Sequence, residues 1–148
     1  MGINRQIIYP FIFVVLLITI TVTIAGAASV PEVKVKPVGH FGGYIETVDV
    51  VGNYAYIGQG QDLVILDIAN LSSPVSVGRV TTKNLISGVK ISGNYAYVAV
   101  GDDGFVIVDV SNPSSPILKG SYDTPGYASN LAISGNYAYL TAGDNGLL

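Results

Sequence analysis

Two aspartates occupy the same place in two copies of one sequence block. Asp67 ends Leu-Val-Ile-Leu-Asp, and Asp109 ends Phe-Val-Ile-Val-Asp 42 residues later. A carboxylate that recurs in this way could face a shared channel, or it could accept hydrogen bonds from backbone N–H groups. A Ser-rich turn follows each aspartate, and a short acidic side chain at the entry of a turn readily accepts such bonds. The sequence favours this structural role, and Asp109→Ala is then expected to lower stability.

Few other residues could take part in catalysis or metal binding. His40 is the only histidine, and the matching positions in the later copies hold Arg79 and Ser121. This variation indicates a solvated position, and a Ser-His-Asp triad would require that histidine. Asp102 and Asp103 stand in a four-residue turn, whereas calcium takes roughly six to eight oxygen ligands. We therefore interpret the turn as a plain hairpin and predict no catalytic, cofactor-binding or metal site.

Tyrosine pairs recur within the sequence Gly-Asn-Tyr-Ala-Tyr, at residues 52–56, 93–97 and 135–139. Such pairs could form an aromatic platform for a carbohydrate. Their regular recurrence favours packing between repeats, because tyrosine combines a large apolar area with a polar tip. Three further tyrosines fall near predicted loops and are expected to be exposed: Tyr44, Tyr122 and Tyr127.

These residues lie on a chain that repeats with a period of about 42 residues. Each repeat predicts four short strands, which in the second copy are Gly88–Ser92, Tyr95–Val100, Phe105–Val110 and Ile117–Tyr122. The dipeptide Gly93-Asn94 is a hairpin signal that requires a positive φ. The third strand is apolar on both faces, which predicts burial on both faces. Four antiparallel strands per repeat describe a propeller blade. The predicted fold class is therefore all-β, a β-propeller, with a parallel β-solenoid as the alternative.

The repeated blocks resemble the LVIVD repeat. Leu63–Asp67 and Phe105–Asp109 carry the motif, and Gly-Asn-Tyr-Ala-Tyr and Ser-Asn-Pro-Ser-Ser-Pro also match the family's usual sequence. The resemblance extends from about Val33 to Leu148. It implies an exported bacterial or archaeal protein of β-propeller form, usually assigned only as a cell-surface or repeat protein. The family pattern supplies no catalytic residue.

The predicted organisation is a signal peptide at 1–28 followed by LVIVD-type repeats over 29–148. Within the repeats we expect an outer strand at 33–41, units at 45–80 and 87–122, and a partial unit at 129–148. These parts amount to about three blades, whereas a closed propeller takes roughly four to eight. The sequence is therefore expected to be a fragment of a longer chain. Pairing of two copies into one ring is the alternative.

The N-terminal residues predict export. Arg5 is the only charged side chain among the first 31 residues, and it precedes the apolar run Phe11–Ile24 and a stretch of small residues. This arrangement is typical of a secretory signal peptide, with an uncleaved membrane anchor as the alternative. The rest of the chain is then expected to be secreted or at the cell surface. In an exported chain, Asn70-Leu71-Ser72 is an acceptor sequence for N-glycosylation, and the sequence does not decide whether it is used.

Composition narrows the classes of function. The chain has no cysteine, which excludes disulfides and thiol catalysis. Its formal net charge of −3 argues against nucleic acid as a partner. We expect a secreted or cell-surface module that binds envelope proteins or glycans without catalysis or a cofactor. Membrane contact is expected only through an uncleaved N-terminal segment, and closure needs the remaining blades of a longer chain or a second copy.

Two other classes of function stay open at this stage. The chain could be a segment of an extracellular propeller enzyme, a hydrolase or lyase, or it could be a purely architectural envelope protein. An enzyme would need a polar cluster that is unique to one repeat, and the copies here are nearly identical.

Overall fold

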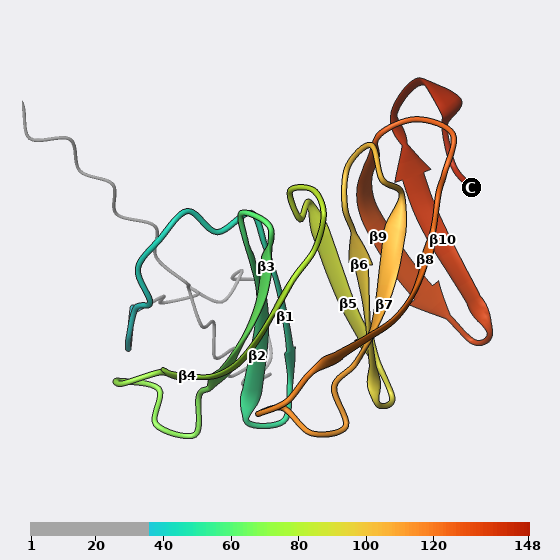
Figure 1. Cartoon of the computed structure of the whole chain (residues 1–148). Helices are drawn as coiled ribbons and strands as arrows, with labels where there is room; N and C mark the ends of the chain where they lie inside the picture. Colours follow the sequence, from blue (N-terminus) through green and yellow to red (C-terminus); the bar gives the residue numbers. More distant parts are fainter. Residues whose placement is uncertain (1–35) are drawn as a thin grey trace, which may run out of the picture.

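The computed structural model describes residues 36–148, which form three neighbouring antiparallel β-sheets (Figure 1). Sheet 1 contains β1 (Thr47–Val51), β2 (Tyr54–Gln59), β3 (Asp62–Asp67) and β4 (Val75–Thr81). Sheet 2 contains β5 (Gly88–Ser92), β6 (Tyr95–Ala99), β7 (Phe105–Asp109) and β8 (Ile117–Tyr122). Sheet 3 contains β9 (Ala128–Ser134) and β10 (Tyr137–Ala142), and a single 3-10 turn follows at Gly143–Asn145.

The predicted all-β class and the four-stranded antiparallel units are confirmed. In sheets 1 and 2 the strands follow one another in chain order, and each pairs with the next. The signal peptide predicted at 1–28 lies outside the described residues. Within residues 36–148, no helix is long and apolar enough to cross a membrane.

The repeated Gly-Asn dipeptide makes the first hairpin turn of each sheet. Gly52, Gly93 and Gly135 have φ values of 60°, 58° and 57°, which a residue without a side chain adopts at little cost. The same turn fixes the same register, because Tyr54 pairs with Asp67 as Tyr95 pairs with Asp109. The repeat in the sequence is therefore a repeat in the hydrogen-bond ladder.

The sheets pack face to face through apolar side chains. Between sheets 1 and 2 the buried residues include Leu63 and Ile65 on one side and Val98 and Val108 on the other. Between sheets 2 and 3 a smaller cluster contains Ala99, Ala128, Leu131 and Leu140. In β3 the four central residues are all buried, as predicted for a third strand covered on both faces. In β7 Phe105 and Ile107 are only half-buried, because sheet 3 has two strands.

The fourth strands of sheets 1 and 2 are largely exposed. Every residue of β8 is exposed, whereas both faces of β3 are buried. Each outer strand also carries a bulge at the same repeat position, where Val77 and Lys119 are left out of the pairing with β3 and β7. A bulge bends its strand and re-aims the next side chains. Both fourth strands are more exposed than the third strands with which they pair.

The segment predicted as an outer strand at 33–41 is described only from residue 36, and residues 36–41 do not form a strand. A strand requires a hydrogen-bonding partner, and among the described residues no strand pairs with this segment. The segment nevertheless occupies an equivalent position. A Cβ on Gly39 would lie 1.9 Å from the Leu71 carbonyl oxygen, as a Cβ on Gly78 would lie 2.0 Å from that of Pro113. Gly39 thus lies against the loop after β3 in the same way that Gly78 of β4 lies against the loop after β7.

Candidate functional site

The two ends of the sheets differ in how much their loops repeat. We call one end the constant end, and its loops are residues 52–53, 68–74, 93–94, 110–116 and 135–136. We call the other end the variable end, and its loops are residues 60–61, 82–87, 100–104, 123–127 and 143–146. The variable end lies at the top in Figure 1. At the constant end the loops carry Gly-Asn in three copies and Ser-Ser-Pro in two, whereas at the variable end sequence and length change.

At the constant end, the repeated aspartates have the structural role that the sequence favoured. Asp67 Oδ1 accepts a hydrogen bond from the Ala69 N–H at 2.8 Å. Asp109 Oδ1 accepts hydrogen bonds from the N–H of Ser111 at 3.0 Å and from its hydroxyl at 2.7 Å. The hydrogen bonds predicted from Asp67 and Asp109 to the following turns are confirmed.

These contacts also change the acidity of Asp109. The hydrogen bond from the Ser111 hydroxyl lowers the pKa of the Asp109 carboxyl, and the backbone N–H of Ser111 lowers it further. The Lys119 ammonium, 3.4 Å from Asp109 Oδ2, adds to the shift. A carboxyl held in its ionised form by turn donors is suited to accepting hydrogen bonds, not to donating a proton.

Inner strands β1 and β5 are joined by polar side chains that the sequence analysis did not single out. Asp49 Oδ2 accepts a hydrogen bond from the Ile91 N–H at 2.8 Å, and Asp49 Oδ1 lies 3.0 Å from Lys90 Nζ. Thr47 Oγ1 accepts a hydrogen bond from the Val89 N–H at 3.2 Å. Both acceptors satisfy backbone donors on the free edge of β5. This polar cluster is unique to one pair of repeats, but its groups bind one another and hold two sheets together.

One large apolar side chain per repeat is exposed at the variable end. Alignment of the copies on their Gly-Asn turns puts Tyr44, Leu85 and Tyr127 at one position, just before the inner strand of each sheet. Their exposed fractions are 62%, 55% and 45%. We call these three residues the apolar rim. Exposed Tyr44 and Tyr127 agree with the sequence prediction, whereas Leu85 was missed because an aliphatic residue in a loop carries no chemical signal alone.

Buried hydroxyl groups hold the rim loops in place. Thr82 Oγ1 lies 2.9 Å from the Gln61 carbonyl oxygen and 2.8 Å from that of Asn84, the residue before Leu85. Thr124, which is the matching residue of the next repeat, lies near the carbonyl oxygen of the residue before Tyr127. Both threonines are buried. Buried hydrogen bonds therefore hold the loops that carry Leu85 and Tyr127.

The acidity of the Tyr44 phenol is changed mainly by an acidic side chain of its own repeat. The Tyr44 hydroxyl donates a hydrogen bond to Glu46, and this bond raises the pKa of the Tyr44 phenol, followed by the negative charge of Glu46. The Tyr127 phenol makes a smaller contribution in the same direction. Tyr44 therefore remains a neutral hydrogen-bond donor, so that its ring stays an uncharged contact surface.

A groove opens at the variable end between the outer parts of sheets 1 and 2. It has a volume of about 250 Å³, and its lining includes Lys83, Asp103, Asp123 and Ser121. The exposed charges at this end are mostly acidic, with Asp102, Asp103, Asp123 and Asp144 against Lys83. Within residues 36–148 no three His, Asp or Glu side chains gather closely enough to hold a metal ion.

Three of the paired tyrosines pack between neighbouring sheets, whereas Tyr95, at the start of β6, is 41% exposed. Tyr56 is buried between sheets 1 and 2, where burial raises the pKa of its phenol, and Tyr54 packs against the same cluster. Tyr97 packs between sheets 2 and 3. Tyr137 is 70% exposed on the outer face of sheet 3. The interpretation that the pairs serve packing is confirmed for the covered faces.

His40, Arg79 and Ser121 are all exposed, as expected for a solvated position. Arg79 forms an ion pair with Asp62 at 3.2 Å. At the glycosylation sequence, Asn70 Oδ1 accepts a hydrogen bond from the Ser72 hydroxyl at 2.7 Å, and Asn70 is exposed.

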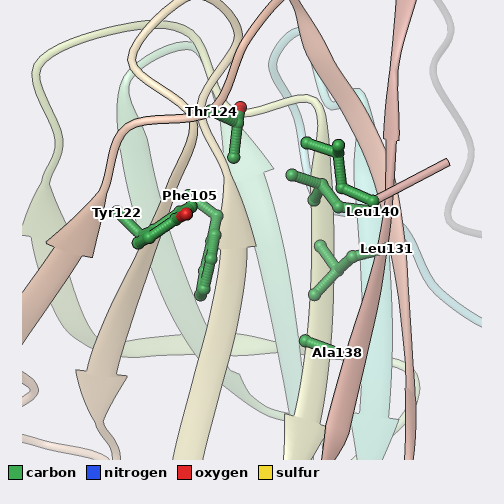
Figure 2. Close-up of a pocket in the computed structure, with 7 residues that line it drawn as sticks. Phe105, Tyr122, Thr124, Leu131, Ala138 and Leu140 are labelled. Atoms are coloured by element: carbon green, nitrogen blue, oxygen red, sulfur yellow. The ribbon is translucent and has the colours of Figure 1, made fainter. Parts of the chain in front are cut away.

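An apolar cavity with a volume of about 340 Å³ lies between sheets 2 and 3. Figure 2 shows Phe105 and Tyr122 on one side facing Leu131 and Leu140 on the other, with Ala138 below them. The rings of Phe105 and Tyr122 lie 5.8 Å apart at an interplanar angle of 43°. Leu148 also lines this cavity.

The fold and its repeated turns define a repeat protein built of blade-like antiparallel sheets. The chain belongs to the LVIVD repeat family, which matches residues 42–82, 86–124 and 125–148. The resemblance inferred from the motifs is therefore confirmed. No curated protein shows a significant match to the chain.

Proposed function

We propose that this chain is a non-catalytic recognition module, secreted or displayed at the cell surface, that binds a protein or glycan partner through its variable end. The observation that carries the proposal is the apolar rim, Tyr44, Leu85 and Tyr127. All three precede the inner strand of a sheet, at the end where loop sequence and length differ between copies. Tyrosine is also among the residues enriched at the centres of interfaces.

The arrangement of rigid strands and differing loops supports this function. Recognition surfaces are commonly built on loops that a rigid scaffold positions, and the threonines beneath the rim supply that scaffold. Export is supported by the N-terminal sequence pattern. The groups best placed for catalysis, Asp67 and Asp109, are engaged by their own turns, which supports binding over turnover.

The proposal is tested with a loop variant and a matched surface variant. Leu85→Ser/Tyr127→Ser removes two rim side chains. Val75→Ser/Ile117→Ser removes two equally exposed apolar side chains from the outer strands. Each purified chain is titrated against envelope proteins and envelope glycans separated from the producing cells. We expect saturable binding that falls about tenfold or more for the rim variant, because interface aromatics contribute roughly 1–2 kcal/mol each.

The control variant should bind as the parent chain does. Equal binding by both variants would show that the variable end is not the site. Ordered self-assembly without a partner would favour the architectural reading, and turnover of a glycan or peptide would favour an enzyme.

A further inference from the structure

The loop after β3 presents the acceptor sequence Asn70-Leu71-Ser72 at the constant end of sheet 1. Asn70 is exposed, and its Oδ1 accepts hydrogen bonds from the Ser72 N–H at 3.2 Å and from the Ser72 hydroxyl at 2.7 Å. Among residues 36–148, Asn70 Nδ2 has no hydrogen-bond partner. The amide oxygen of this side chain therefore holds the turn, whereas the nitrogen, which N-linked glycosylation modifies, is not engaged by another group of the fold.

The matching loop of sheet 2 has the same geometry but lacks the acceptor sequence. Asn112 is exposed, and its Oδ1 accepts a hydrogen bond from the Ser114 N–H at 3.2 Å. In both loops the asparagine carbonyl oxygen also accepts a hydrogen bond at 3.0 Å from the N–H three residues later. Pro113 stands where the first loop has Leu71, and the acceptor sequence excludes proline at this position. From asparagine to the final proline, the two loops are otherwise identical in sequence.

We propose that Asn70 carries an N-linked glycan, an inference that rests on the export proposed above. The sugar donor is an oligosaccharide linked to a lipid phosphate. A bond forms between Asn70 Nδ2 and the anomeric carbon of the oligosaccharide, and the bond from that carbon to the phosphate oxygen breaks. The lipid phosphate leaves with the electron pair of the broken bond, and Nδ2 loses one proton. Asn112 stays unmodified, because Pro113 follows it.

The folded chain accommodates the glycan without a change in the loop. Glycosylation replaces one hydrogen on Nδ2 and keeps Oδ1, so both hydrogen bonds from Ser72 to Asn70 Oδ1 persist. A glycan is bulky and suits a surface position, which the exposed Asn70 provides. The loop lies at the opposite end of the sheets from the apolar rim (Figure 1). The glycan therefore leaves the surface proposed for recognition uncovered.

The test uses the full chain purified from the cells that produce it, after fractionation into cytoplasmic and exported material. Mass spectrometry of the intact exported chain should give a mass above that of the polypeptide by a whole number of sugar residues. Fragmentation of its peptides should place the sugar on Asn70 and leave Asn112 unmodified. An exported chain whose Asn70 is unmodified would overturn the inference and leave the proposed export standing. A chain found only in the cytoplasm would overturn the proposed export and the glycosylation with it.

Paired variants made in the same cells locate the modification. Asn70→Gln should lose the added mass completely, whereas Asn112→Gln should keep it. Ser72→Ala should also lose the added mass, and Ser72→Thr should restore it, because the acceptor sequence takes either hydroxyl residue. Retention of the added mass in Asn70→Gln would overturn the assignment to this residue.

A gain of modification tests the comparison of the two loops. Pro113→Leu gives the second loop the acceptor sequence of the first, and the added mass should double, with the second glycan on Asn112. A Pro113→Leu chain that carries sugar only on Asn70 would contradict the argument that the geometry of this loop suits a glycan. Binding through the variable end should be equal for the parent and Asn70→Gln, because the glycan lies at the constant end.

Discussion

Single acidic residues in this chain act by accepting backbone hydrogen bonds, and the consequence depends on where the donor belongs. Asp67 and Asp109 accept from the turn that follows them, so each stabilises its own repeat. Asp49 accepts from Ile91 in the next repeat, so it stabilises the contact between repeats. The aspartates thus differ in role because Asp67 and Asp109 bind a donor in their own repeat, whereas Asp49 binds a donor in the next repeat.

Removal of the Asp49 carboxylate is expected to destabilise the contact between sheets 1 and 2. Asp49→Ala leaves the Ile91 N–H without its acceptor and should lower the free energy of unfolding by about 1–2 kcal/mol. Lys90→Ala removes only a partly exposed ion pair and should cost less than about 0.5 kcal/mol. Urea denaturation of both variants measures the difference. Equal losses would mean that the ion pair, not the backbone hydrogen bond, carries the stabilisation.

The lowered pKa of Asp109 predicts a pH dependence of stability. A carboxyl whose pKa is lower in the folded than in the unfolded chain stabilises the fold fully above its ordinary value of 3.8. This contribution is lost as the pH falls through the folded-state pKa. Asp109→Asn carries no ionisable group there. The Tm difference between the parent and Asp109→Asn should therefore be constant near neutral pH and shrink below about pH 4.

Ser111→Ala provides the matched control for this pH effect, because it removes the donor that lowers the Asp109 pKa most. The stability of the Ser111→Ala variant should fall less steeply with decreasing pH than the stability of the parent chain. If the Tm values of the parent and of Asp109→Asn fell in parallel through the acid range, Asp109 would not be the source of the pH dependence.

At the level of strands and turns, the sequence predicted most of what the structure shows. The Gly-Asn turns, the alternating second strand and the apolar third strand are local patterns, and local patterns decide where a strand lies. The predicted strand at 33–41 was wrong over residues 36–41, because pairing depends on a partner that a local pattern cannot supply. The contacts of Asp49 and the exposure of Leu85 depend on how sheets meet, and no spacing in the chain encodes them directly.

Close packing between an outer strand and the next turn gives a prediction at this scale. A Cβ on Gly78 would lie 2.0 Å from the Pro113 carbonyl oxygen, whereas a Cβ on Gly120, one repeat later, has no atom within 4 Å. Gly78→Ala should therefore cost about 1–3 kcal/mol through overpacking. Gly120→Ala should be neutral or slightly stabilising, because glycine weakens a strand. Thermal unfolding of both variants compares the same substitution at equivalent positions, and equal effects would contradict the packing argument.

Across the molecule, burial differs from one sheet to the next although the sequences are alike. The second strand of sheet 1 has four buried residues, that of sheet 2 has three, and that of sheet 3 has two. In repeat proteins, stability is approximately the sum of each repeat's own stability and its contacts with neighbours. Sheets with the same hairpin turns and the same Tyr-Ala-Tyr strands should therefore open at different free energies.

Native-state hydrogen exchange measures this directly. We expect amides of β2 and β3 to be the slowest, those of β6 and β7 to be intermediate or equally slow, and those of β9 and β10 to be the fastest, since local opening is easiest where few apolar contacts must be broken. The Tyr137 amide should exchange much faster than that of Tyr54, although both begin the same sequence Tyr-Ala-Tyr. Uniform protection across the three sheets would mean that they open as one cooperative unit, and that local burial does not set the stability of each repeat.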